Sequence, residues 1–188
     1  MSNQPLGIMP QVDEPWGFAG IRRENRGVFA DSRIFYVDPN HVLAVDDGNT
    51  GENPACPLLT IQKAITLARA YKGDTIYVLS SNSWQYGTGT QVGIAESVIV
   101  PFDKPGIRII GVGGGPMGVY WIPGATTEFC ITVNALDVEI AGFCFWGQAL
   151  AAANGIYLSW SGVGTWGENT KIHHCYFTDD LEDRKSVV

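Results

Sequence analysis

A six-residue pattern recurs three times in this sequence: Gly106-Ile107-Arg108-Ile109-Ile110-Gly111, Asp137-Val138-Glu139-Ile140-Ala141-Gly142 and Asn169-Thr170-Lys171-Ile172-His173-His174. The second copy begins 31 residues after the first, and the third begins 32 residues after the second. Another short strand-like run precedes each copy, at residues 97–100, 129–133 and 155–160. Short strands that recur at a nearly constant spacing, with no helix between them, indicate a chain that stacks on itself.

Within each copy, alternate residues are mainly apolar, so one face of each strand is expected to point into a core. Stacking equivalent strands about 4.8 Å apart would place Ile109, Ile140 and Ile172 in one internal ladder. The residues next to them would form an outer row of alternating charge: Arg108, Glu139 and Lys171. A β-sandwich also gives alternation, but it offers no reason for the 31- and 32-residue spacing.

One helix is expected ahead of the repeats. Thr60 is a suitable N-cap, and Gly73 is a suitable left-handed stop after the last turn. The apolar residues between them fall on one helical face: Ile61, Ala64, Ile65, Ala68 and Tyr71. A short strand is expected on each side of this helix, at residues 33–37 and 74–79.

Four segments around this helix resemble the entry module of pectate-lyase-like right-handed β-helix proteins: Tyr36-Val37-Asp38, Asp47-Gly48-Asn49-Thr50-Gly51, Pro57-Leu58-Leu59-Thr60-Ile61-Gln62-Lys63-Ala64-Ile65 and Gly73-Asp74-Thr75-Ile76-Tyr77-Val78. In that family the T-I-Q-x-A-I helix caps the N-terminal end, and G-D-T-I-x-V opens the first turn. The resemblance spans roughly residues 33 to 180 and implies an all-β fold, a right-handed single-stranded parallel β-helix with an N-terminal capping α-helix. Such a cap would cover unpaired backbone groups and apolar core at the open end.

The resemblance does not select an activity, because lyases, esterases, epimerases, adhesins and phage spikes share this fold. A short aromatic arm ahead of the first strand, with no signal peptide, is similar to β-helix proteins that bacteriophages encode. It implies a virion or another extracellular surface as the location. Homotrimers are common among phage spikes of this kind, so a homotrimer is one expected assembly.

Three segments are expected along the chain. Residues 1–32 are rich in Pro and Gly and read as an extended N-terminal arm, and residues 33–182 form the cap and first turns of the β-helix. Residues 183–188, Asp-Arg-Lys-Ser-Val-Val, match the translation of a common short-read sequencing adapter, so we expect them to be an artefact. On this interpretation the chain is a truncated N-terminal fragment, and the genuine protein continues past Glu182.

Composition excludes several classes of partner. The net charge is −7 and there is no basic stripe, which argues against nucleic acid because phosphate contacts supply most of that affinity. No apolar stretch approaches the roughly 20 residues that span a bilayer, and the N-terminus has no apolar signal-peptide region. Three of the four cysteines lie in apolar, strand-like runs and are expected to be small core residues: Cys130, Cys144 and Cys175.

The sequence predicts no resident cofactor, with calcium as the one ion to consider. Asp179 and Asp180, with Asp137 one repeat earlier, are candidates for calcium binding or for acid/base chemistry, against the simpler interpretation that they form turns. The oxygen-rich loop at residues 46–53 is better explained as a solvated turn. His173 and His174 are adjacent on an expected strand, so their side chains should point to opposite faces and not share a metal.

Aromatic residues give the better functional indication. Six of them lie in or beside glycine-rich loops, where exposed rings could stack on sugars: Trp84, Tyr86, Trp121, Trp146, Trp160 and Trp166. The alternative is that they fill the core or pack over the loops. We therefore expect a structural or glycan-attachment protein of a virion or cell surface, whose partners are polysaccharide or other virion proteins. A polysaccharide lyase or glycosidase whose catalytic turns are missing is the alternative.

Overall fold

The computed structural model describes residues 32–79, 94–113, 118–125, 127–146, 155–159 and 167–178. The expected arm at residues 1–31 and the C-terminal residues 179–188 lie outside these ranges. The described part is all-β apart from one short helix, and every strand pair in it is parallel. The all-β, parallel fold class that the sequence predicts is therefore confirmed.

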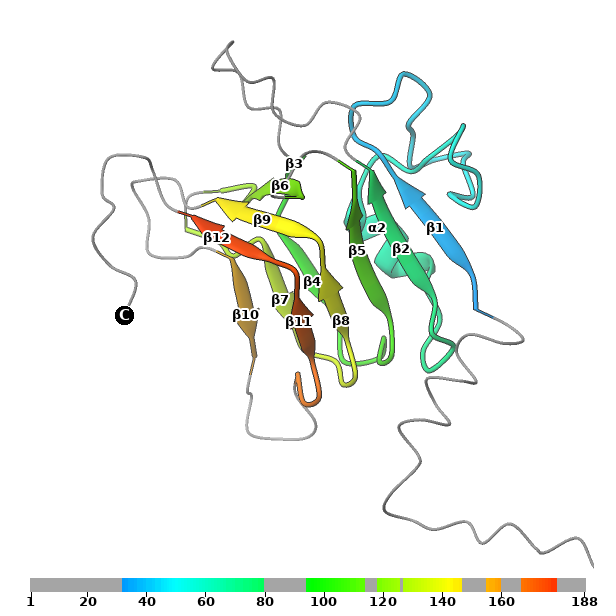
Figure 1. Ribbon diagram of the computed structural model, residues 1–188. Helices are drawn as coiled ribbons and strands as arrows, with labels where there is room; N and C mark the ends of the chain where they lie inside the picture. The colour runs from blue at the N-terminus through cyan, green and yellow to red at the C-terminus, as the bar shows by residue number, and fades with distance from the viewer. Residues whose placement is uncertain are drawn as a thin grey trace, which may run out of the picture.

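The strands form three sheets (Figure 1). Sheet A has the order β1-β2-β5-β8-β11, with β1 at Ile34–Val37, β2 at Thr75–Leu79, β5 at Arg108–Val112, β8 at Glu139–Ala141 and β11 at Lys171–His173. Sheet B has the order β12-β9-β6-β3, with β3 at Ile94–Ala95, β6 at Val119–Ile122, β9 at Phe143–Trp146 and β12 at Tyr176–Thr178. Sheet C has the order β10-β7-β4, with β4 at Val98–Val100, β7 at Ile131–Val133 and β10 at Ile156–Leu158.

From β4 onward the chain passes through the sheets in one fixed order, C then A then B, and does so three times. Each pass lays its strand directly beside the strand of the previous pass. The register places Ile76, Ile109, Ile140 and Ile172 side by side across sheet A; the repeat predicts the last three of these as neighbours. The first three are fully buried, whereas Ile172, on the edge strand β11, is 39% exposed.

The core lies between the sheets and receives side chains from all three of them and from the helix. Sheet B carries a column of large rings that are register partners: Trp121 and Phe145 are buried in the core, and Phe177, on the edge strand β12, is 62% exposed. All four cysteines lie within the described residues and are free thiols, with Cys130 and Cys144 buried and Cys175 partly buried. The prediction that these three act as core residues is confirmed for the first two.

Helix α2 spans Ile61–Leu67 and begins as predicted, with the Thr60 side chain accepting a hydrogen bond from the Lys63 backbone N–H. The carboxylate of Glu96 accepts hydrogen bonds from the first two backbone N–H groups of the helix. Burial raises the pKa of Glu96 above its ordinary value, despite these two donors.

The helix also covers the outer edge of sheet C. The Gln62 side-chain oxygen accepts from the Ile99 backbone N–H at 2.8 Å, and its amide nitrogen donates to the Ile99 carbonyl at 3.1 Å. Ile99 lies in β4, the edge strand of that sheet. A side-chain amide thus pairs with backbone groups that a missing strand would leave unsatisfied, which is the physical role expected of a cap.

The end of the helix differs from the prediction. It stops at Leu67, so Tyr71 is not on its buried face but is 62% exposed with a positive φ of 56°. The Lys104 ammonium donates to the carbonyls of Thr66 and Ala68, which satisfies the last turn. Tyr71 then donates its backbone N–H to Pro105, so a contact with the next pass of the chain ends the helix early.

Asp74, from the G-D-T-I-x-V segment, joins three parts of the entry region. Its carboxylate is fully buried and accepts hydrogen bonds from the backbone N–H groups of Arg33 and Arg69 and from the Arg69 guanidinium. Burial alone would raise the pKa of Asp74, but these donors outweigh it and hold the pKa below its ordinary value. Asp74 is therefore a buried, ionised anchor that ties β1 and the helix end to β2.

Candidate functional site

The outward face of sheet A presents two parallel columns of side chains. The strand register defines the first column as Ile34, Thr75, Arg108, Glu139 and Lys171. It defines the second as Tyr36, Tyr77, Ile110, Ala141 and His173. One column is thus mostly polar or charged, while its neighbour is mostly aromatic or aliphatic.

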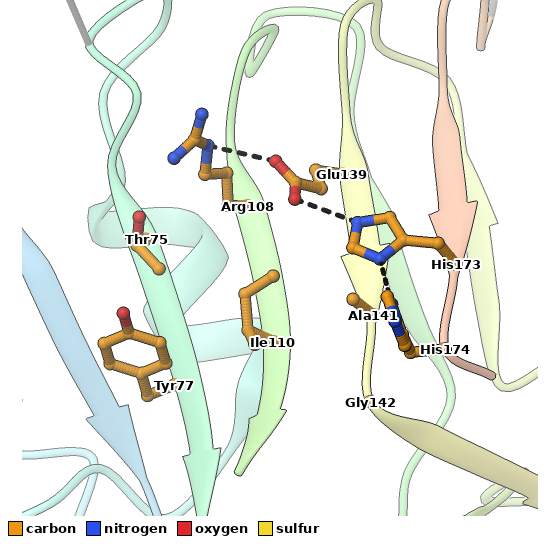
Figure 2. Close-up of a pocket in the computed structure, with 9 residues that line it drawn as sticks. All are labelled: Thr75, Tyr77, Arg108, Ile110, Glu139, Ala141, Gly142, His173 and His174. Carbon is orange, nitrogen blue, oxygen red and sulfur yellow. Dashed lines mark hydrogen bonds and ion pairs between the residues drawn. The ribbon is translucent and has the colours of Figure 1, made fainter. Parts of the chain in front are cut away.

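A hollow of about 410 Å³ lies over these columns and is drawn in Figure 2. We call it the sheet A hollow; its lining comprises Thr75, Tyr77, Arg108, Ile110, Glu139, Ala141, Gly142, His173 and His174. The concavity has a simple cause, because Ala141 and Gly142 carry little or no side chain between larger neighbours. The lining residues come from four adjacent strands and the corners after β8 and β11, so the register of sheet A sets their spacing.

A continuous polar row crosses the sheet A hollow. The Arg108 Nε lies 3.1 Å from Glu139 Oε2, and the other carboxylate oxygen, Oε1, lies 3.0 Å from His173 Nε2 (Figure 2). These side chains are only partly exposed, with 33% for Arg108 and 24% for Glu139. The carboxylate therefore bridges a guanidinium on β5 and an imidazole on β11, and each holds the other in place.

His174 extends this row by one residue. The Nδ1 atoms of His173 and His174 are 2.7 Å apart, and the two rings meet edge to face. The expectation that these side chains point to opposite faces is wrong, because strand alternation stops at His173. His174 occupies the corner after β11 with a left-handed φ of 53°, which turns its ring back toward its neighbour.

The other end of the hollow is aromatic. The rings of Tyr36 and Tyr77 lie 6.0 Å apart with a 38° tilt, on adjacent strands of sheet A. Next to them on the same column come Ile110 and Ala141. An apolar strip thus runs beside the charged row, so the sheet A hollow is amphipathic across its width.

Trp121, a predicted sugar-stacking residue, is not at the surface. Its side chain is fully buried against the rings of Phe143 and Phe145, and its indole N–H donates to the Glu96 carbonyl at 2.7 Å. It belongs to β6, so it lies on a strand and not in a loop, and it packs in the core. Four of the other five predicted aromatic residues lie outside the described part of the chain: Trp84, Tyr86, Trp160 and Trp166. For the fifth, Trp146, only the backbone is described.

Asp137, a candidate calcium ligand, occupies a corner. It has a left-handed φ of 55°, as do the positions one pass earlier and later, Gly106 at 77° and Asn169 at 56°. The Asn169 amide donates to the Asp137 carboxylate at 3.3 Å. The structure thus gives Asp137 a place in a stacked turn, while Asp179 and Asp180 lie outside the described residues.

Metal ligation has little support in the part of the chain that the structure describes. No group of three or more His, Cys, Asp or Glu side chains there could hold a metal ion. In the oxygen-rich loop, Asp46 directs both carboxylate oxygens at protein donors, namely the backbone N–H groups of Leu59 and Thr60 and the Thr60 hydroxyl. That loop therefore braces the start of the helix.

Sequence reasoning missed the residues that the structure brings together. Glu139 was expected in the outer charged row, but Tyr77 and His173 were not assigned to that face, and the three residues lie on different passes of the chain. Only the register unites them. A signal was present in the third repeat, where His173-His174 replaces the Ala141-Gly142 of the second.

Comparison with protein-family models, with curated proteins and with solved structures found no match. Among the described residues, no helix has the length and apolar character needed to cross a membrane.

Proposed function

We propose that this chain is part of a right-handed parallel β-helix of the pectate-lyase-like kind, which serves a virion or cell surface as a structural and glycan-attachment protein. The repeated C–A–B order of the strands and the in-register isoleucines support the β-helix. The helix that covers the edge of sheet C supports its identity as an N-terminal cap.

The observation that carries the binding role is the amphipathic sheet A hollow. A pyranose ring has apolar C–H faces and a rim of hydroxyl groups. Tyr77 and Ile110 offer an apolar surface to such a face, while Arg108 and Glu139 offer charged donors and acceptors to the rim. Sugar recognition is thus proposed at this hollow and not at the tryptophan loops.

The charge of the outward face of sheet A, over which the hollow lies, indicates the kind of glycan. The charged column carries Arg108, Glu139 and Lys171, a local charge of about +1, on a chain whose net charge is −7. The positive charge at this surface therefore offsets the repulsion that the rest of the molecule exerts on an acidic glycan. Glycans with neutral or acidic residues fit these groups better than amino sugars do.

A glycan array with the 188-residue chain tests the proposal. Tyr77→Ala should lower the affinity for every bound glycan by about tenfold, which is the loss of one ring stacking contact. Tyr157→Ala is the matched control, because Tyr157 is also an outward ring on a strand, stacked at 4.7 Å on Phe129, but belongs to sheet C. Equal losses for the two variants, or no bound glycan, would contradict the proposal.

The polar row also favours an enzymatic alternative, a polysaccharide lyase or glycosidase. A carboxylate that holds an imidazole in position is an arrangement that general acid/base catalysis uses, and Arg108 would stabilise the carboxylate. Incubation of the chain with acidic and neutral polysaccharides decides between the two. New reducing ends or unsaturated uronates that disappear in Glu139→Gln would establish the enzyme, and binding without any cleavage would favour attachment.

A further inference from the structure

We propose that His173 and His174 form a proton-controlled carboxylate-recognition site at the end of the sheet A hollow. In the neutral pair the Nε2 of His174 accepts a hydrogen bond from a ligand, and in the singly protonated pair it donates one. The site rests on the proposed binding function and specifies its ligand as a carboxylate-bearing sugar, bound preferentially at acidic pH.

The neutral state follows from the contacts. A Glu139 carboxylate only accepts hydrogen bonds, so the His173 Nε2 that lies 3.0 Å away must carry the proton. In a neutral ring the His173 Nδ1 is then a lone pair. The His174 Nδ1, 2.7 Å from it, must therefore carry a proton and donate it. That leaves the His174 Nε2 as a lone pair on an exposed ring that lines the hollow.

Addition of one proton reverses this polarity whichever ring receives it. If His174 is the charged ring, both of its nitrogens carry protons, so Nε2 donates. If His173 is the charged ring, its Nδ1–H donates to the His174 Nδ1, and the neutral His174 must then hold its own proton on Nε2. Addition of a second proton would make both Nδ1 atoms N–H donors that face each other across 2.7 Å. In this geometry the pair therefore accepts only one additional proton.

The other charged and titratable groups around the pair favour an anion once that proton is present. Glu139 on β8 contacts His173 directly and is paired with Arg108 on β5, so these two charges offset each other, and Tyr77 on β2 lies further along the lining. On the pair's own segment, Lys171 adds a positive charge, and the Cys175 thiol lies 3.3 Å from the His173 carbonyl. The guanidinium nitrogens of Arg108 other than Nε point away from Glu139 (Figure 2). Glu139 lies between the Arg108 guanidinium and the histidine pair (Figure 2), so a carboxylate at the His174 Nε2 would pair with the charged imidazoles and not with the guanidinium.

The backbone at His174 is a second, independent observation. The corresponding corner one pass earlier is Gly142, with a φ of 78°. A histidine in the left-handed region costs roughly 1–2 kcal/mol that glycine would not. Glycine would therefore fit this corner with less strain, as it does one pass earlier.

Nitrogen-15 NMR of the ligand-free chain tests the proton arrangement without any glycan. In the neutral pair we expect the His174 ring to carry its proton on Nδ1 and the His173 ring on Nε2, and after addition of one proton we expect the two rings to share it. Glu139→Gln should remove the tautomer preference, because an amide can donate as well as accept. A His174 ring protonated on Nε2 at about pH 8, or two rings that titrate independently, would overturn the proposal.

Titration with glucuronate and with glucose tests the ligand class, because these probes differ only in a carboxylate. Glucuronate should bind at least about tenfold more tightly at about pH 5 than at about pH 8, as expected for one charge-assisted hydrogen bond, while glucose should change little. The double variant His173→Ala/His174→Gly reproduces the Ala141-Gly142 sequence of the previous pass, so it should fold and lose this pH dependence. Glucuronate binding that is unchanged by pH or by the double variant would overturn the site, whereas the glycan-attachment role itself fails if no glycan binds or if Tyr77→Ala and Tyr157→Ala lose the same affinity.

Discussion

Truncation of Ile140 should be among the most damaging single changes to this fold. Ile140 is fully buried in β8, between its register partners Ile109 and Ile172. Ile140→Ala removes three carbons, which is about 2.4 kcal/mol of transfer free energy at ~0.8 kcal/mol per methylene. The enclosed cavity adds about 1 kcal/mol, so the free energy of unfolding should fall by about 3–4 kcal/mol.

Ile172→Ala is the matched control, because it makes the same chemical change in the same column. Ile172 lies on the edge strand and is 39% exposed, so less area is lost from the core and no closed cavity forms. The expected loss is about 1.5 kcal/mol. The difference between the two variants measures how far the column is enclosed by neighbouring strands.

Equilibrium unfolding in urea, followed by far-ultraviolet circular dichroism, gives both values. The midpoint should move while the m-value stays constant, since the surface exposed on unfolding is nearly unchanged. Equal losses for the two variants, or a loss below about 1 kcal/mol for Ile140→Ala, would refute the stacked internal column.

Three other substitutions examine the anchor and the corners. Asp74→Asn should lower the free energy of unfolding in urea by about 3 kcal/mol, because it leaves Arg69 without its buried carboxylate. Since the pKa of Asp74 is lowered on folding, the stabilisation is present above about pH 4 and is lost as the pH falls through the lowered value. The variant should lack that pH dependence. Gly142→Ala should destabilise the fold by more than about 2 kcal/mol, because the added Cβ would lie 2.3 Å from a backbone carbonyl of the neighbouring strand. Gly48→Ala is the control: this glycine has a positive φ but open space around it, so the substitution should cost only about 1 kcal/mol. Similar thermal shifts for the two variants would contradict this prediction. His174→Gly should raise the melting temperature or leave it unchanged, since it relieves left-handed strain, and a clear decrease would mean that the histidine contact outweighs the strain.

The register of sheet A could be predicted from the sequence because one constraint repeats. In a parallel ladder, equivalent residues of successive passes lie side by side, so the 31- and 32-residue spacing of the copies fixes which isoleucines meet. The charged row of Arg108, Glu139 and Lys171 follows from the same register. Periodicity therefore gave both the inside and the outside of these strands.

The end of the helix could not be predicted from its own residues. The apolar spacing continues to Tyr71, and Gly73 is a suitable stop, so local pattern alone favours a longer helix. The helix ends at Leu67 because Lys104, which is distant in the sequence, binds a carbonyl of its last turn. Asp74, just ahead of β2, accepts a hydrogen bond from the backbone N–H of Arg69. Tertiary contacts decided this boundary.

The error at Trp121 has a related cause. The glycines around residues 111–118 suggested a loop, but Val119–Ile122 is a strand whose Trp121 aligns with the buried Phe145 of the next pass. Sheet B does not recur with a clear sequence pattern, because its equivalent core positions hold an isoleucine, a tryptophan and then phenylalanines. Where the core accepts rings of different size, spacing alone does not identify the inward face.

The same logic explains why the candidate site lies where the repeat changes. One core position stays isoleucine across β2, β5, β8 and β11 because each must fill the same space, and the corner after β8 is Gly142, whose left-handed φ would strain most other residues. The packing of the fold therefore accounts for Ala141-Gly142 but gives no reason for His173-His174 in the next pass. A pair that costs backbone strain, contacts Glu139 and lines a hollow needs a cause outside packing. In a stacked protein, functional residues should thus be sought where successive passes stop matching.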